Sequence, residues 1–265
     1  MTGDFQQAVR QGMLSLRRAA ERPGIGVKQE RSLHAILKYW MEPDEALHEQ
    51  VLPGTGQIAD IFDGERVTEV QTGSFTALRK KLERMLPLYP VTVVYPLPRA
   101  KRLIWVEEDG SLGDPHASPK KGQPWDAFDQ LVYVAPLLGH PRLTVRLVLL
   151  DLDEYRRRDG WGREGKRGSH RLERIPRLDE KAAPPAVWDL QSAADYGRLL
   201  PSELPCPFTS VDLKKALRRS AKHTQGVIYT LYTCGSIVRK GKSGHAYVYE
   251  PAENSAENNA KNDKL

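Results

Sequence analysis

Two carboxylates stand where a β-hairpin would bring them together: Asp60 in the run Ile-Ala-Asp-Ile-Phe-Asp and Glu69 in the run Val-Thr-Glu-Val-Gln-Thr. Asp63-Gly64 between these β-rich runs is a turn signal, so the sequence predicts two antiparallel strands. With a four-residue loop Asp60 lies directly opposite Glu69, whereas a two-residue loop pairs Asp60 with Val67, and the sequence leaves both registers open. Directly opposed carboxylates repel each other unless a cation lies between them.

A divalent cation would remove this repulsion. Mg²⁺ typically binds one or two protein carboxylates, keeps several waters and takes its remaining oxygens from substrate phosphate. The hairpin therefore predicts a Mg²⁺ or Mn²⁺ site held by Asp60 and Glu69. The seven histidines are scattered without a helical His-x-x-x-His pair, and the two cysteines form no pair, so the sequence does not predict a zinc site.

A helix before the hairpin and a helix after it would position this site. The first is predicted over residues 29–41, and its apolar periodicity places Glu30 on the inward face with Leu33 and Leu37. His34 lies one turn after Glu30 and could reach the same pocket, although we expect a histidine on the helix surface. The second helix is predicted over residues 75–86 with Ser74 as its cap.

The remaining pattern is that of an α/β protein. A short amphipathic helix is predicted over residues 4–22, and another helix is marked by apolar residues from Trp125 to Ala135. Strands are predicted at residues 91–95, 103–106 and 143–150. Residues 151–185 are charged and Gly-rich, which predicts a basic, partly ordered excursion that ends in a linker.

Composition sets broad limits. The 265 residues include 40 Lys and Arg against 34 Asp and Glu, and this modest net charge of +6 fits a polyanionic partner without requiring one. Two cysteines are too few for a disulfide framework, which favours reduced thiols and a cytoplasmic location. The N-terminus lacks a signal-peptide pattern and the chain has no bilayer-length apolar run, so we expect no membrane partner.

The C-terminal 201–250 stretch predicts a helix, a turn, a second helix and a β-hairpin. Thr209 and Asp212 form a capping-box pattern, Arg218-Arg219-Ser220 makes the turn, and Gly235 suits the end of the second helix. Strands at residues 237–240 and 245–249 around Gly-Lys-Ser-Gly resemble a wing. This arrangement resembles a winged helix-turn-helix, whose second helix enters the major groove of DNA.

Basic residues are concentrated in the same stretch, which contains eight Lys or Arg and three Asp or Glu. Such an excess favours contact with DNA phosphates, although many winged helices bind protein and a basic turn can be merely solvated. The predicted DNA contacts are Arg218, Arg219, Lys222, Gln225, Tyr229, Lys240 and Lys242.

The order of helix, hairpin with Asp60 and Glu69-Val70-Gln71, helix and strand resembles the core of the PD-(D/E)xK, or restriction-endonuclease-like, nuclease superfamily over about residues 28–106. The resemblance implies an α-βββ-α-β core in which Asp60 and Glu69 bind Mg²⁺. It also implies that Gln71 positions the attacking water and that Glu30 completes the site. With the winged helix, the arrangement also resembles a group of uncharacterised bacterial proteins.

Two positions depart from the superfamily pattern. Ala59 replaces the usual Pro, and Gln71 replaces the usual Lys, so the site lacks a positive charge that would stabilise the developing phosphorane-like charge. Some active members have Gln there, and Lys81 beside the apolar stripe of the next helix is a better substitute than solvent-facing Lys80.

These observations predict five successive segments: an N-terminal helix (1–27), a restriction-endonuclease-like domain (28–150), a basic extension and linker (151–200), a winged helix (201–250) and a disordered tail (251–265). The expected function is Mg²⁺-dependent hydrolysis of DNA phosphodiester bonds. The alternatives are a non-catalytic DNA-binding protein or regulator with a degenerate nuclease fold, and a protein-interaction role for both modules. Formation of a homodimer stays open.

Overall fold

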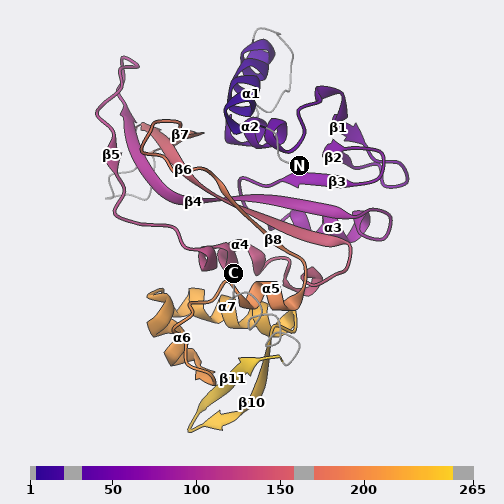
Figure 1. Ribbon diagram of the computed structural model, residues 1–265, viewed down its shortest axis with the longest axis vertical. Coiled ribbons are helices and arrows are strands. Elements are labelled where there is room, and N and C mark those ends of the chain that lie inside the picture. The colour runs from indigo at the N-terminus through magenta and orange to yellow at the C-terminus, as the bar shows by residue number, and fades with distance from the viewer. Residues whose placement is uncertain (1–3, 21–31, 158–169, 253–265) are drawn as a thin grey trace. The chain divides into compact units, whose positions relative to one another are not determined.

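The computed structural model of the protein describes residues 4–20, 32–157 and 170–252 (Figure 1). Glu30 and nearly all of the predicted C-terminal tail lie outside these residues. The helices are α1 (Phe5–Ala20), α2 (Ser32–Met41), α3 (Leu78–Met85), α4 (Phe128–Leu131), α5 (Ala193–Gly197), α6 (Ser210–Leu217) and α7 (Ala221–Thr233), with 3₁₀ turns η1 (Glu45–Leu47), η2 (Pro124–Ala127) and η3 (Ala135–Leu137). Together with the strands of two sheets, these helices confirm the predicted α/β class.

The strands form two sheets. The larger contains β1 (His48–Val51), β2 (Ile58–Phe62), β3 (Val67–Val70), β4 (Val91–Val106), β5 (His116–Ala117), β6 (Leu143–Arg157), β7 (His170–Pro176) and β8 (Ala186–Leu190). Its order is β1-β2-β3-β4-β6-β7, while β5 pairs with β4 and β8 with β6. The smaller sheet has the order β10-β11-β9 and contains β9 (Phe208–Thr209), β10 (Ile237–Ser243) and β11 (Ala246–Pro251).

The large sheet is mixed. The pairs β1–β2, β2–β3 and β6–β7 are antiparallel. Ion pairs between β4 and β6 advance in the same direction along both strands, since Arg99 contacts Asp151 and Arg102 contacts Asp153. These two central strands therefore run parallel, as strands joined by helical crossovers do.

Packing divides the chain into two compact units, each assembled from three segments. The first contains Met1–Thr72, Val94–Gly122 and Val148–Val187, and the second contains Gly73–Val93, Gln123–Leu147 and Trp188–Leu265. These units interleave along the chain, whereas the predicted domains follow one another, and the predicted boundaries remain predictions.

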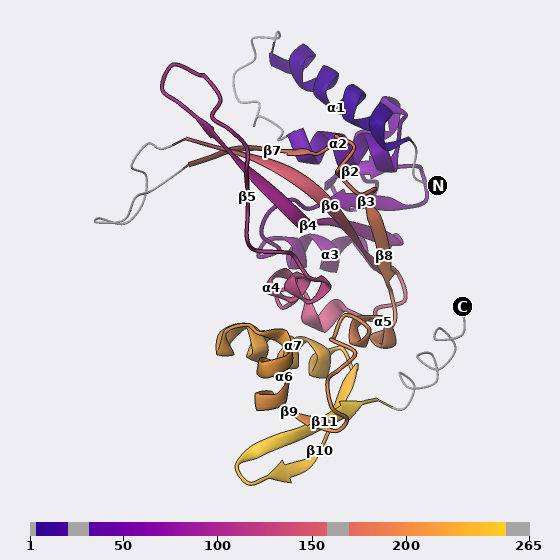
Figure 2. The ribbon, with the colours of Figure 1, turned by 60° about the vertical axis from the view of Figure 1, so that its left-hand side comes forward.

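Helices α1 and α2 supply one side of the core of the first unit. They cross closely (Figures 1 and 2), and Phe5 meets Trp40 edge to face with ring centres 4.9 Å apart. Gly12 permits the crossing, because a Cβ there would lie 2.8 Å from backbone atoms of Ile36. The core also includes Leu33 and Leu37 of α2 and apolar residues of β3, β4 and β6, namely Val70, Val94, Val148, Leu150 and Leu152.

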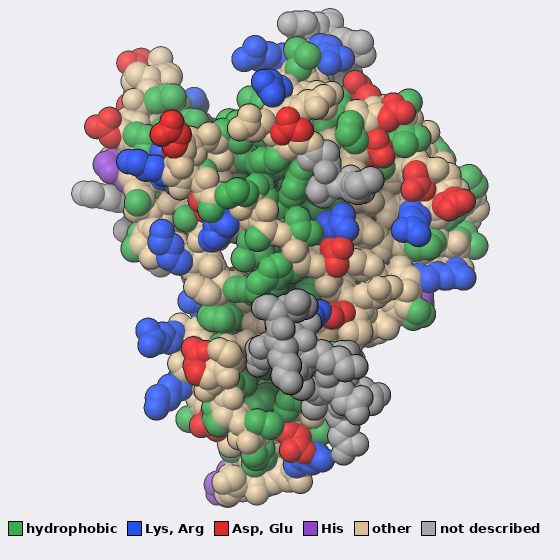
Figure 3. All heavy atoms as spheres, viewed as in Figure 1, with side chains coloured by type: hydrophobic (Ala, Val, Ile, Leu, Met, Phe, Trp, Pro, Cys, Tyr) green, Lys and Arg blue, Asp and Glu red, His purple; other side chains and the backbone are tan. Residues whose placement is uncertain are grey.

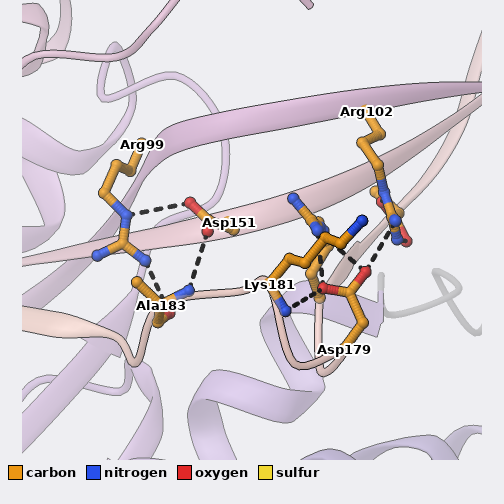
Figure 4. A network of polar contacts seen from close by, with 8 residues as sticks. Arg99, Arg102, Asp151, Asp179, Lys181 and Ala183 are labelled. Carbon is orange, nitrogen blue, oxygen red and sulfur yellow. Dashed lines mark hydrogen bonds and ion pairs between the residues drawn. The ribbon is translucent and has the colours of Figure 1, made fainter. Parts of the chain in front are cut away.

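The predicted bounds of three strands were wrong, and the first residues of the predicted excursion, 151–157, belong to a strand. The strands expected at 91–95 and 103–106 are one strand, β4, and the strand expected at 143–150 continues to Arg157. Charged residues enter these strands because they pair across them: Asp151 with Arg99, and Asp153 with Arg102, which also contacts Asp179 (Figure 4). Hydrogen bonds from Arg177 are the largest of the contacts that hold the pKa of Asp179 below its usual value.

Two predicted helices are shorter than expected. Helix α3 begins at Leu78 without a side-chain cap, because Ser74 instead accepts a hydrogen bond from the Thr76 amide in the preceding turn. The helix expected between Trp125 and Ala135 is divided into η2, α4 and η3. Pro136, which has no amide hydrogen to donate, follows the first residue of η3.

Candidate metal site and nucleic-acid interface

The hairpin adopts the register with a four-residue loop. Phe62 pairs with Val67 and Ile61 with Thr68, and continuing this register by one residue places Asp60 opposite Glu69. The Asp63 carboxylate accepts hydrogen bonds from the amides of Glu65 and Arg66, at 2.9 and 2.7 Å, and so organises the turn. Local turn chemistry therefore fixes which face the two carboxylates share.

Both carboxylates are withdrawn from solvent. The Asp60 side chain is 17% exposed and its Oδ2 accepts a 2.7 Å hydrogen bond from the Val70 amide, while Glu69 is fully buried. Burial strengthens the repulsion between opposed carboxylates, because the local dielectric is lower than that of water. This pair therefore requires positive charge or a shared proton nearby.

His34 of α2 supplies one candidate for that charge. Its Nε2 lies 3.3 Å from Asp60 Oδ2, with a side chain that is mostly buried, so the expectation of a surface histidine was wrong. One turn later, buried Lys38 places its ammonium 2.6 Å from Glu49. Its position one turn after Glu30 was the only sequence signal that His34 could reach this site. The contact with Asp60 was not predicted, because it joins residues of α2 and β2.

The donor set partly fits a hard divalent cation. Two carboxylates on one face suit the oxygen preference of Mg²⁺ or Mn²⁺, which need few protein ligands when water and phosphate supply the others. Within residues 4–20, 32–157 and 170–252, no group of three or more His, Cys, Asp or Glu side chains is arranged to hold a metal ion. Glu30, the predicted third acid, lies outside the described residues.

The other two predicted residues of this site are Gln71 and Lys81. The half-buried Gln71 directly follows β3, and its amide donates a 2.8 Å hydrogen bond to the Val94 carbonyl of β4. Lys81 belongs to α3 in the second unit, where it is half-buried while Lys80 is exposed, as the helical periodicity predicts. The role of Lys81 in the Asp60 site stays a prediction.

In the C-terminal segment the predicted caps are confirmed. The Thr209 hydroxyl and the Asp212 carboxylate form the capping box of α6, with Asp212 Oδ2 accepting from the Thr209 amide at 2.8 Å. Hydrogen bonds from Thr209 are the largest cause that lowers the pKa of Asp212. Gly235, with φ of 77°, follows the last turn of α7 as predicted, and Ser220, which was predicted only as part of the turn, caps the start of α7.

The turn of the β10–β11 hairpin differs from the prediction. Strand β10 continues through Gly241 to Ser243, which pairs with Ala246, so the turn is Gly244-His245 and not Gly-Lys-Ser-Gly. A bulge between Arg239 and Gly241 shifts the register, and the backbone of Gly241 adopts φ of 158° there. Strand β9 adds a third strand by pairing with β11.

The predicted DNA contacts divide into two groups. Arg218, Lys222, Gln225, Tyr229 and Lys242 are exposed. Arg219 instead makes a bidentate ion pair with Asp126, at 2.8 and 2.9 Å, and Lys240 contacts Glu250 at 2.5 Å. The charges of these two residues are therefore offset within the protein. Figure 3 shows basic side chains at the surface over α6.

The C-terminal helices also pack against the middle of the chain. Helix α7 contacts α4 and η3, and the buried His223 places its Nδ1 2.7 Å from Asp129 of α4. Ala221, the first residue of α7, is exposed. Residues 201–250 thus share packing with α4 and are held to it by contacts that sequence reasoning missed.

None of the described helices is both long enough and apolar enough to cross a bilayer.

An uncharacterized protein from Treponema pallidum (strain Nichols) is 28% identical to this chain over 233 residues, which cover 85% of this chain and 86% of that protein. No solved structure matches the chain. The family model described as "Domain of unknown function (DUF8091)" matches residues 31–181, which include Asp60, Glu69, Gln71 and Lys81, and the chain belongs to this family.

Proposed function

We propose that the protein is a Mg²⁺- or Mn²⁺-dependent DNA endonuclease of the restriction-endonuclease-like type. The observation that carries this proposal is the register of the β2–β3 hairpin, Ile61 with Thr68 and Phe62 with Val67, whose continuation by one residue brings Asp60 opposite the fully buried Glu69. A buried pair of opposed carboxylates is destabilising in an ordinary hairpin and is useful where a cation must be held.

The order of elements supports the nuclease resemblance. Helix α2, the meander β1-β2-β3, helix α3 and strand β4 follow one another in the α-βββ-α-β order, and the strands are neighbours in that sequence in the sheet. The Asp lies on the second strand and the Glu on the third, which are the positions that the resemblance implies.

Each side chain has a distinct role in the proposed site. A bound Mg²⁺ would polarise the scissile phosphate and lower the pKa of an attacking water. Asp60 and Glu69 would hold the ion, and the amide hydrogen bond from Val70 fixes the orientation of Asp60. His34 contacts Asp60 Oδ2 and would set its remaining acceptor direction. Gln71 would orient water through its carboxamide without adding charge.

The C-terminal segment would deliver this site to DNA. Its elements β9, α6, α7, β10 and β11 are ordered as in a winged helix, with β9 paired to β11 as the third strand of the sheet. Helix α7 exposes Lys222, Gln225 and Tyr229 at spacings of three and four residues, so they share one face. The exposure of these three side chains on one face supports the proposal that α7 contacts DNA.

Cleavage of DNA with added Mg²⁺ or Mn²⁺ tests the proposal. We expect the wild type to cut duplex, single-stranded or branched DNA, and expect Asp60→Asn and Glu69→Gln to lose at least about 100-fold in rate, since each removes a charge that holds the ion. Glu65→Gln is the matched control, because Glu65 is an exposed carboxylate of the same hairpin. Cutting that survives both site variants would refute the assignment.

The second candidate is a non-catalytic DNA-binding protein with a degenerate nuclease fold. The contact between His34 and Asp60 favours it, because an imidazole N–H at 3.3 Å satisfies one acceptor direction of the carboxylate without metal. Titration with Mn²⁺ separates the two candidates. Binding of Mn²⁺ that is lost in Asp60→Asn and Glu69→Gln supports the nuclease, whereas DNA binding without metal binding supports the second candidate.

A further inference from the structure

A cluster of tyrosine and basic side chains joins helix α7 to the β10–β11 hairpin. The Arg239 guanidinium carbon lies 4.5 Å from the ring centre of Tyr232 and 4.3 Å from that of Tyr247. Lys242 places its ammonium 5.0 Å from the centre of the Tyr247 ring. Distances below 6 Å are those of cation–π contacts, so the basic groups hold both rings in place.

The rings of this cluster remain open to solvent. Tyr232 is 45% exposed and Tyr247 is 42% exposed, and Tyr229, one turn before Tyr232 on α7, is 51% exposed. A stack that served only to fasten the hairpin to the helix would bury these rings, because aromatic side chains gain most of their stabilising effect from burial. These tyrosines therefore present aromatic surface for a partner.

The charge around the rings selects the partner. Residues 221–251 contain four Lys or Arg and one acidic residue, Glu250, which contacts Lys240 and not Arg239. Exposed aromatic rings beside basic groups match a polyanion that carries flat apolar faces. Unpaired nucleotides have both properties, whereas the bases of a duplex are stacked on each other and present only their edges.

We propose that Tyr232, Tyr247 and Arg239, with Tyr229 beside them, form a stacking surface for unpaired bases of DNA. Bases stack on the open faces of the rings, and Arg239 with Lys242 contacts the phosphates between them. This inference deepens the proposed function by naming DNA with a single-stranded segment as its substrate class, and it rests on the DNA-binding part of that proposal.

Fluorescence anisotropy with a labelled oligothymidylate of about 16 nucleotides tests the surface. The full-length protein is used with EDTA, so binding is measured without cleavage. We expect tighter binding to the oligothymidylate than to a duplex of equal length. Tyr232→Ala and Tyr247→Ala should each weaken single-strand binding about 5- to 100-fold, while the corresponding Phe variants stay within about 2-fold because they keep the ring.

Two controls separate stacking from general effects. Tyr133 is 44% exposed and lies outside the tyrosine cluster in the second unit, so the variant Tyr133→Ala should bind the oligothymidylate as tightly as the wild type. The dependence of affinity on salt should keep its slope in the Tyr→Ala variants, since their phosphate contacts remain, whereas Arg239→Gln should reduce the slope by about 0.7. Thermal denaturation of each variant establishes that it is folded.

The stacking surface is refuted if the wild type does not bind the oligothymidylate, or if the Phe variants lose as much affinity as the Ala variants. An oligouridylate that binds more tightly than the oligothymidylate would also refute it, because the proposed ligand is DNA. If the Ala variants bind the oligothymidylate normally while the wild type still cuts DNA through Asp60 and Glu69, the stacking surface is refuted and the nuclease proposal stands. If the Ala variants lose affinity for the oligothymidylate but the wild type cuts no DNA, the stacking surface stands and the nuclease proposal is refuted.

Discussion

Replacement of Gly12 by Ala tests whether the close crossing of α1 and α2 is a rigid feature of the first unit. The new Cβ would lie 2.8 Å from the Cα and the amide nitrogen of Ile36 and 2.9 Å from its Cγ1. Ordinary van der Waals contact begins at 3.4 Å, so the helices must separate by about 0.6 Å. Two of the three clashing atoms are backbone, and a rotamer change of Ile36 therefore cannot relieve the overlap.

Two opposing effects set the magnitude. Overpacking of a tight contact costs about 1–3 kcal/mol, while replacing a glycine by alanine inside a helix stabilises by about 0.5–1 kcal/mol. We expect Gly12→Ala to destabilise the first unit by about 1–2 kcal/mol. Gly226 is the matched control, because it lies inside α7 and a Cβ added there would have no neighbouring atom within 4 Å. Gly226→Ala should stabilise by about 0.5–1 kcal/mol.

Hydrogen exchange measures each effect locally. Amides of α2 should exchange about 5- to 30-fold faster in Gly12→Ala, and amides of α7 about 2- to 5-fold slower in Gly226→Ala, given that 1.4 kcal/mol corresponds to about tenfold. Unchanged or slower exchange in α2 of Gly12→Ala would show that α1 yields without loss of packing, and the reasoning from the close crossing would fail.

Three further predictions concern the caps and ion pairs. Thr209→Ala removes the cap of α6 and should lower the free energy of unfolding by about 1 kcal/mol, measured by urea denaturation against the exposed control Thr233→Ala. A double-mutant cycle on Arg219 and Asp126 should give a coupling of about 1 kcal/mol, reduced from the buried value because both side chains are partly exposed, and a coupling near zero would contradict the bidentate pair. Burial raises the pKa of Glu154, but contacts with Arg156 and Lys101 outweigh it and the net shift is downward. Its contribution to stability is therefore complete above the unfolded pKa of about 4.3 and is lost as the pH falls through the lower folded pKa, so urea midpoints measured from about pH 6 to about pH 2 should fall less steeply in Glu154→Gln.

The β2–β3 hairpin and the C-terminal helices could be predicted from the sequence because the interactions that determine them are local. Asp63 accepts hydrogen bonds from residues two and three positions later, and this turn restricts the register that brings Asp60 opposite Glu69. The two members of the capping box, Thr209 and Asp212, are three positions apart, and Lys222 and Tyr229, which were predicted to contact DNA, are exposed on α7. Short-range hydrogen bonds and side-chain periodicity are present in the sequence before any tertiary contact forms.

The contacts that the sequence did not reveal join residues far apart in the chain. His34 contacts Asp60 across 26 positions, Arg219 pairs with Asp126 across 93, and Arg102 pairs with Asp153 across 51. Sequence patterns therefore determined the α/β class, the presence of the β2–β3 hairpin and the capping box of α6. Only the tertiary structure decided the length of β4 and β6 and the partners of the charged residues, because a charge is accepted in a strand or beside a carboxylate only when a distant residue offsets it.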